Sequence, residues 1–405
     1  MPDRILALPA RIARWSLLSA LIGALAGLAA AGLLLSLRWA TAQFEASGVA
    51  LLFLMPVATQ IVFWLYARFA PSVARGTPLL VERLVDNRGP VSARLIPMAF
   101  VTPLLGVLTG APAASITGTI QLGGALADSV SRLLRLSPED RRILLMAGLG
   151  AGFGAGAGAP LAGAVFGLEL QRHDDIRGRG TVPCLVAALA ANAVVEALGA
   201  SPLRIPLTSA LPSLSAASLA LLIGLGVLFG LWARLFLIAT QALRRASERL
   251  VGPRAWLQPA LASVLIVGLI ALAGWREAAG LSTTSLAEAL HGAGGGLQVA
   301  IPKFVVTALA VSGGFRMGEV TPLFVMGSGL GVAAGGSLGV APDVLAALGM
   351  TTVFGAAANV PLAAAILAGE RFGPAVLPMA LGVALVADLV SGPRGIYGWR
   401  RREGA

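Results

Sequence analysis

The sequence predicts an all-α, polytopic membrane protein, and three features of its 405 residues carry that prediction. Hydrophobic residues make up 57% of the chain, charged residues make up only 12%, and uncharged apolar runs recur along its length. Soluble domains average about 45–50% apolar and about 25% charged residues. A soluble enzyme of this size is excluded, because it would have too few charges to cover its surface. The high apolar content also excludes a disordered chain.

The net charge of +11 comes from 30 basic and 19 acidic residues, and we interpret it as membrane topology. The basic residues, all arginine except Lys303, lie between the apolar runs and not on one basic face, so we expect no nucleic-acid partner. Short cytoplasmic loops collect positive charge. Arginines near both ends therefore predict cytoplasmic termini in the cell (inner) membrane. Cys184, His173 and His291 are too few for a disulfide framework or an ordinary metal site, so we expect no metal and no cofactor.

A membrane-spanning helix needs about 20 mostly apolar residues. The charge-free runs predict ten or more hydrophobic helices, some of them too short or too broken to span. The first, Trp15–Leu37, is longer than the apolar part of a signal peptide and is predicted to be the first transmembrane helix. Ser137 and Pro138 are typical of a helix start. Arg244–Arg254 is predicted to be a basic loop between the two halves of the chain.

An internal repeat divides the chain. Residues 148–169 and 349–370 match at ten of 22 positions with an offset of 201 residues, and the matches include Pro160 with Pro361 and Glu169 with Glu370. In each copy a proline breaks the backbone before an apolar helix that ends in glutamate. We interpret both glutamates as structural carboxylates, with a proton relay as the alternative. Broken helices at matching positions are typical of membrane transporters. Glycines at every fourth position, at 148, 152 and 156 and at 150, 154 and 158, predict close helix packing.

A full positive charge is costly to bury in a membrane and binds an anion too tightly to release it. Helix N-termini instead offer unpaired N–H groups and a partial positive charge. Three segments with small polar residues open apolar helices and are the candidate anion-binding sites. Their candidate residues are Ser115, Thr117, Gly118 and Thr119, then Glu319 and Val320, and, as a weaker case, Gly76 and Thr77. Arg75, Lys303 and Arg316 can attract anions toward the pore mouths.

Three segments of the sequence resemble a known protein family. Residues 137–169, 314–331 and 391–401 resemble the CLC chloride channels and proton-coupled antiporters, closest to their bacterial fluoride-exporting branch. The resemblance covers roughly Gly76 to Tyr397. It implies a single transmembrane domain over residues 1–405, with two inverted repeats at about 15–200 and about 213–399 and no cytoplasmic accessory domain. It also implies a homodimer with one pore per subunit, embedded in the lipid bilayer, and a Tyr397 hydroxyl that faces the bound anion.

The chain departs from the family pattern at its most informative position. The family sequence Gly-Arg-Glu-Gly-Pro or Gly-Arg-Glu-Gly-Thr is replaced by Ser-Ile-Thr-Gly-Thr, so that Thr117 stands where the resemblance places the gating glutamate. A threonine hydroxyl does not titrate near neutral pH. Leu170 follows Glu169 where many proton-coupled members carry an inner glutamate. Residues 74–78 also diverge from the family's Gly-Ser-Gly-Ile-Pro.

The sequence therefore predicts a non-enzymatic protein that carries chloride or fluoride passively through a CLC-type pore. A proton-coupled fluoride antiporter that uses another acid, such as Glu319, is the alternative within the family. An intramembrane hydrolase with Ser328 as nucleophile and His291 as base is the alternative from another class, although nothing in the sequence orients the histidine. A scaffold that transports nothing is the fourth reading.

Overall fold

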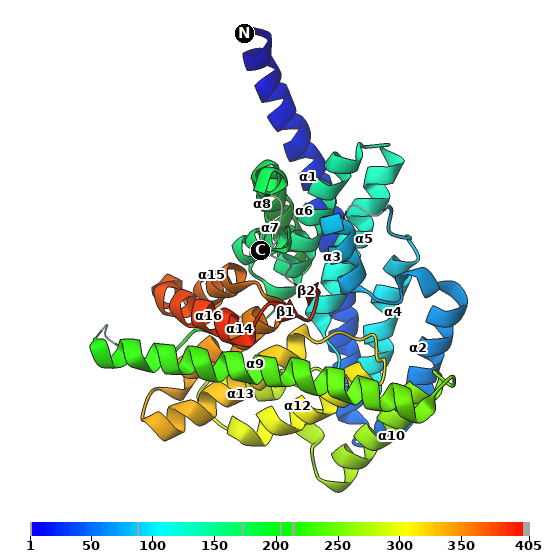
Figure 1. Ribbon diagram of the computed structural model, residues 1–405, viewed down its shortest axis with the longest axis vertical. Helices are drawn as coiled ribbons and strands as arrows, with labels where there is room; N and C mark the ends of the chain where they lie inside the picture. Colours follow the sequence, from blue (N-terminus) through cyan, green and yellow to red (C-terminus); the bar gives the residue numbers. More distant parts are fainter. Residues whose placement is uncertain (1, 87–88, 172–173, 203–204, 213–214, 400–405) are drawn as a thin grey trace. The chain divides into compact units, whose positions relative to one another are not determined.

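The computed structural model describes residues 2–86, 89–171, 174–202, 205–212 and 215–399. The described residues form sixteen α-helices, four 3-10 turns and one hairpin of two-residue strands, which confirms the all-α class (Figure 1). The α-helices are α1 (Pro2–Ala46), α2 (Met55–Phe69), α3 (Thr77–Asp86), α4 (Leu95–Leu108), α5 (Ser115–Leu133), α6 (Pro138–Ala157), α7 (Pro160–Leu170), α8 (Asp174–Ala197), α9 (Ala216–Val251), α10 (Leu257–Leu272), α11 (Thr283–Leu290), α12 (Gly296–Ser312), α13 (Val320–Leu338), α14 (Pro342–Ala358), α15 (Pro361–Phe372) and α16 (Leu377–Ser391). The hairpin pairs β1 (Arg394–Gly395) with β2 (Gly398–Trp399) in antiparallel register.

The apolar helices have the lengths that a membrane protein requires. Within the described residues, six helical segments are long and apolar enough to cross a membrane, and five shorter apolar helices accompany them. This confirms the expected ten or more hydrophobic helices. Large apolar side chains such as Leu17, Leu272 and Leu389 are more than two-thirds exposed on the helices. An exposed apolar surface of this kind is what a bilayer covers.

The chain folds into two compact units that interleave along the sequence. Unit 1 comprises Met1–Leu35, Arg75–Phe100 and Gly118–Pro202, and unit 2 comprises Ser36–Ala74, Val101–Thr117 and Leu203–Ala405. In unit 1, α6 packs against α3, α7 and α8. In unit 2, the long helix α9 contacts α12, α14 and α16, and α13 packs along α14 (Figure 1).

The sequence repeat is also a repeat of local structure. Gly158 after α6 and Asn359 after α14 both adopt the left-handed conformation, with φ of 64° and 57°. Each donates its backbone N–H four residues back, to Gly154 and Gly355. Pro160 and Pro361 then open α7 and α15, as the sequence predicts. Left-handed caps followed by proline end one helix and start the next in both copies.

The repeated glycines allow helix backbones to touch. In unit 1, a methyl group on Gly148 would lie 2.5 Å from the carbonyl oxygen of Gly123 in α5. In unit 2, Gly349 of α14 and Gly327 of α13 oppose each other in the same way. Gly150 faces α7 at Gly163, so the two glycine series of α6 serve two different neighbours. The predicted close packing is confirmed.

Two sequence boundaries are wrong. Helix α1 continues past Leu37 through Arg38 and Glu45 to Ala46, and α9 includes most of the predicted basic loop because it extends to Val251. The added turns of α9 are exposed, including Arg244, Arg245 and Arg249, and Arg244 pairs with Glu248 at 3.7 Å one helical turn away. Charged residues at a helix end extend into the interface without breaking the helix. The basic residues 400–402 lie outside the described residues.

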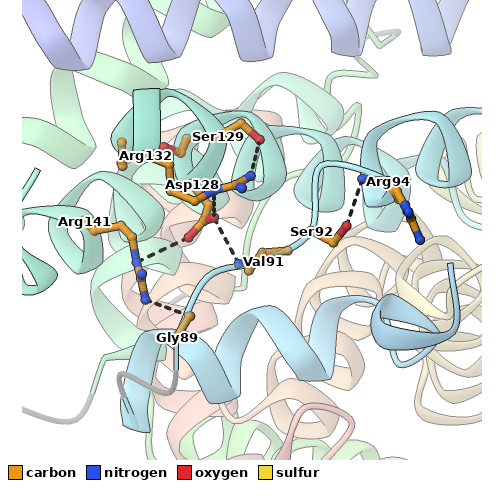
Figure 2. A network of polar contacts seen from close by, with 10 residues as sticks. Gly89, Val91, Ser92, Arg94, Asp128, Ser129, Arg132 and Arg141 are labelled. Atoms are coloured by element: carbon orange, nitrogen blue, oxygen red, sulfur yellow. Dashed lines mark hydrogen bonds and ion pairs between the residues drawn. The ribbon is translucent and has the colours of Figure 1, made fainter. Parts of the chain in front are cut away.

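The buried carboxylate of Asp128 in α5 holds two segments of unit 1 in place: the stretch before α4 and the first turn of α6 (Figure 2). The Asp128 side chain is fully buried and accepts hydrogen bonds from the Val91 backbone N–H at 3.0 Å and from Arg132 Nε at 3.1 Å. Arg141 Nε lies 3.4 Å from its other oxygen and donates through Nη2 to the Gly89 carbonyl oxygen. A buried charge with several donors is held in a single arrangement.

Removal of this carboxylate is the largest stability loss that we expect in unit 1. Asp128→Ala leaves the Val91 N–H without its acceptor and the half-buried Arg141 without its ion-pair partner, so the free energy of unfolding is expected to fall by about 3 kcal/mol. The exposed pair of Arg75 and Glu82, 2.5 Å apart, supplies the control. Glu82→Gln is expected to cost less than about 1 kcal/mol. Thermal unfolding in detergent measures both, and equal losses would contradict the assignment.

Candidate anion-binding site

The N-terminus of α13 has no side-chain cap. The helix begins at Val320 after Glu319, as the sequence predicts, and Glu319 makes no side-chain capping bond. Pro322 has no N–H in the first turn, so the amides of Val320 and Thr321 are the leading donors. Both residues are buried. The end of α13 thus presents polarised N–H groups in an apolar setting, which suits a small anion.

The first turn of α5 lies directly against this helix end in unit 2. The Val320 N–H points to the Thr117 Oγ1 at a long 3.5 Å, and the hydroxyls of Ser115 and Thr321 are 3.3 Å apart. One residue earlier, the Ala114 N–H donates to the Met317 carbonyl oxygen at 2.8 Å. Residues 114–117 and 317–321 therefore form one continuous contact, here called the α5–α13 junction. The sequence predicted both helix starts, and the structure brings them together.

Glycine is required at two positions, one within this junction and one beside it in α4. Gly318 has a φ of +81°, and a side chain on it would overlap the Thr117 side chain. Gly106 in α4 is covered by the Met317 sulfur, which leaves no room for a side chain there. Gly318 is thus the residue that lets α13 approach α5. Sequence reasoning missed Met317, since a methionine in a loop carries no signal of its own.

Thr117 gives the junction a neutral hydroxyl. Its side chain is only 4% exposed. A hydroxyl donates one hydrogen bond and accepts others, but it carries no charge near neutral pH. The junction therefore offers backbone amides and neutral hydroxyl groups, which are donors that can bind and release a small anion.

Tyr397 lies near Glu319 of the junction. Tyr397 lies in the turn between β1 and β2, its hydroxyl oxygen is buried, and Glu319 is close enough to act on it electrostatically. The hairpin is tied to the end of α14, because the Ile396 N–H donates to the Ala357 carbonyl oxygen at 2.8 Å. The Asn359 Nδ2 also donates to Gly392 O at 2.9 Å. Tyr397 is therefore placed by the break between α14 and α15.

The three basic candidates have separate environments. The Arg316 guanidinium stacks over the Tyr66 ring at 4.7 Å and donates to the Ala74 carbonyl oxygen. Arg75 is exposed and paired with Glu82. Lys303 is fully buried, so it does not lie at an open mouth as expected from the sequence.

The remaining candidates lie in unit 1. Gly76 adopts a φ of +59° before α3, and Thr77 is 1% exposed. Gln121 Nε2 donates to the Thr77 Oγ1 at 3.3 Å, so a glutamine that the sequence analysis did not select orients this hydroxyl. Its only sequence signal is a polar residue in an apolar helix. Thr119 in α5 is fully buried, and its carbonyl oxygen lies against Gly152 of α6. Gly118, the residue before it, is part of the same helix.

The two structural carboxylates and the hydrolase candidates can be placed as well. Glu169 and Glu370 are half-buried in the last turns of α7 and α15. Ser328 is buried in α13 and donates to the Val325 carbonyl oxygen at 3.0 Å. His291 is exposed at the end of α11, with Nδ1 2.7 Å from the Ala287 carbonyl oxygen. Each of these two side chains thus bonds to its own helix, which is not the arrangement of a nucleophile and its base.

The chain is similar to known chloride and fluoride transport proteins. A family model described as "Voltage gated chloride channel" matches residues 58–392. The "Chloride/fluoride channel protein" of Pseudomonas syringae pv. tomato is 35% identical, over 98% of this chain and 88% of the relative. The "H(+)/Cl(-) exchange transporter ClcA" of Vibrio cholerae serotype O1 is 27% identical over 82% of this chain and 75% of the relative. The crystal structure of "a CLC-type fluoride/proton antiporter" superposes with a TM-score of 0.90 at 28% identity, covering 95% of this chain and 97% of that one. The helical membrane fold expected from the sequence is confirmed.

Proposed function

Because this chain belongs to the voltage-gated chloride channel family, we propose that it conducts chloride or fluoride passively across the membrane through the α5–α13 junction. Membership of this family makes the protein a channel or transporter and not an enzyme, so the hydrolase alternative is set aside. The relatives include a protein named as a channel and others named as proton-coupled exchangers. The difference between those two modes depends on the groups that touch the anion.

One observation carries the passive mode: the side chain that reaches the Val320 amide is the neutral Thr117 hydroxyl. Coupling needs a group that binds a proton in one state and competes with the anion in the other. A carboxylate can do both, because it mimics the charge of the anion and titrates. A threonine does neither. Without that exchange, the anion moves down its own gradient, and a proton gradient cannot drive its transport.

Reconstituted efflux tests the proposal. Liposomes that contain the purified protein and either fluoride or chloride are expected to release the anion once a potassium ionophore balances the charge. The release rate is expected to be the same with and without a pH gradient. Liposomes without protein provide the baseline. Absence of release above that baseline supports the scaffold alternative, and a rate that follows the pH gradient supports proton coupling.

Proton coupling through Glu319 is the second candidate, favoured by its place at the start of α13 beside Tyr397. The passive proposal predicts that Glu319→Gln keeps anion release independent of pH, with a rate within about tenfold of the parent protein because the N-cap charge is lost but the amides remain. The measurement is the release rate across a range of pH. If the parent protein shows a pH dependence that Glu319→Gln abolishes, the coupled mode is correct.

We further propose that the protein lies in the cell (inner) membrane with both termini cytoplasmic, as a homodimer with one pore per subunit. Arginines near both ends support this orientation. Light scattering of the purified protein in detergent gives the mass of the assembly. Accessibility of a single engineered cysteine near residue 14 from each side of the membrane gives the topology.

A further inference from the structure

The C-terminal end of α9 carries a group of charges that the proposed anion pathway does not use. Residues 244–254, here called the α9 basic end, cover the last two turns of the helix and the start of the loop before α10. Four arginines lie in this segment, and all four are exposed: Arg244, Arg245, Arg249 and Arg254. The segment holds a single acidic residue, Glu248. It is therefore a strongly basic surface of unit 2.

Most of these arginines have no acidic partner. Within the described residues, Arg244 pairs with Glu248 at 3.7 Å, and both side chains of that pair are more than half exposed. An exposed ion pair of this kind contributes little. The guanidinium groups of Arg245, Arg249 and Arg254 have no hydrogen-bond or ion-pair partner in the part of the chain that the structure describes. Three full charges are thus available to a partner.

The length of α9 leaves this end for the surface of a bilayer. Residues 216–251 contain an apolar window long enough to cross a membrane. The 36 residues of the helix correspond to about 54 Å, whereas the hydrocarbon core of a bilayer is about 30 Å thick. The side chains next to the arginines suit the boundary, because Leu250 is 79% exposed and Trp256 is 53% exposed. Tryptophan is typical of the headgroup level of a membrane.

Further positive charge lies beside the α9 basic end in unit 2. Arg394 of β1 donates to the Gln241 Oε1 at 2.9 Å, one helical turn before Arg244. Arg244 is also close enough to Arg316 to act on it electrostatically. Clustered charges of one sign raise the local potential and attract the opposite charge. The partner that fits this surface is therefore an anion.

Among anionic partners, a phospholipid matches both the charge and the apolar surface. Arg245 and Arg249 are one helical turn apart, so their guanidinium groups lie on the same face of α9. Guanidinium groups bind phosphate oxygens in a bidentate manner. Basic clusters next to a membrane-spanning helix attract anionic headgroups. Leu250 and Trp256 offer contact to acyl chains, which a nucleic acid or an acidic soluble protein would lack.

We propose that the α9 basic end is a binding site for an anionic phospholipid. The phosphate group lies against Arg245 and Arg249, and the upper part of the acyl chains lies against Leu250 and Trp256. The headgroup neutralises charges that the protein itself leaves unpaired. This site is separate from the α5–α13 junction and does not depend on how the anion crosses the membrane.

Native mass spectrometry of the full chain in detergent tests the site. The probes are phosphatidylglycerol, which is anionic, and phosphatidylcholine with the same acyl chains, which is zwitterionic. We expect the first phosphatidylglycerol molecule to bind at a concentration at least about tenfold lower than the first phosphatidylcholine molecule. The double variant Arg245→Gln/Arg249→Gln is expected to weaken phosphatidylglycerol binding by a similar factor, because two charges near the phosphate are lost.

Two further variants serve as controls. Glu248→Gln removes the one acidic side chain of the α9 basic end, so it is expected to strengthen phosphatidylglycerol binding about fivefold. A gain of affinity cannot result from misfolding. Arg135→Gln/Arg276→Gln removes two exposed arginines outside this segment and changes the net charge of the protein equally. It is expected to leave the binding of both lipids unchanged.

The outcomes decide the proposal. Equal affinity of the parent protein for the two lipids overturns it. A preference for phosphatidylglycerol that Arg245→Gln/Arg249→Gln retains places the lipid elsewhere and also overturns it. Equal losses in the two double variants would show that net charge alone determines binding. Displacement of phosphatidylglycerol by millimolar inorganic phosphate would make this a site for free phosphate and not for a lipid.

Discussion

Gly318→Ala is expected to reduce anion release by at least about tenfold, the largest loss that we expect from a single methyl group. The added carbon would overlap the Thr117 side chain, and the backbone at φ +81° disfavours any residue other than glycine. Both effects push the start of α13 away from α5. The Val320 amide then no longer lies opposite the Thr117 hydroxyl. Release of fluoride and chloride from liposomes measures the loss.

A matched control separates the clash from backbone strain. Gly314 lies in the same loop with a φ of +79°, but a side chain on it meets nothing within 4 Å. Gly314→Ala therefore carries the strain without the collision. It is expected to keep most of the release activity. If both variants lose activity equally, strain in the loop accounts for the effect and the contact with Thr117 does not.

Thr117→Glu is expected to make anion release depend on pH. At neutral pH the new carboxylate is charged and accepts the Val320 N–H in place of the anion. A charge-assisted hydrogen bond of this kind contributes about 1.5–3 kcal/mol, enough to lower release about tenfold or more. As the pH falls, protonation removes the charge and release rises.

Thr117→Gln is the neutral counterpart of this change. Glutamine has nearly the same size as glutamate but does not titrate, so its effect on release is expected to be constant with pH. The measurement is the release rate of both variants across the same pH range. Equal profiles for the two variants would show that position 117 acts through size alone and that its side chain does not compete with the anion.

Much of the fold could be predicted because its signals are local. Proline and small polar residues mark the starts of α3, α5, α6, α13 and α15, and the structure begins each helix where these residues stand. The Ser137 hydroxyl accepts from the Asp140 N–H at 3.1 Å, as its capping role requires. The register of the repeat was visible because its glycines and prolines perform backbone functions that other residues perform poorly.

The two helix starts of the site were predicted, but the residue contacts that join them were not. The contact of Thr117 with Gly318 joins residues about 200 positions apart, and no local pattern reports such a distance. The prediction of a basic loop at Arg244–Arg254 was wrong because its charged residues were interpreted as the end of a helix. Helix α9 instead continues to Val251 with these side chains exposed. The burial of Lys303 was missed because its acceptors are carbonyl oxygens, which every residue carries.

Uphill proton movement tests the central claim most directly. Liposomes that contain the protein, loaded with fluoride or chloride at high concentration and buffered to equal pH on both sides, report internal pH through an enclosed dye. The account predicts that, with a potassium ionophore to balance the charge, the outward anion gradient drives anion release while the internal pH stays constant. A sustained change of internal pH that the anion gradient drives, and that a protonophore dissipates, would contradict passive conduction and assign a proton carrier to this chain.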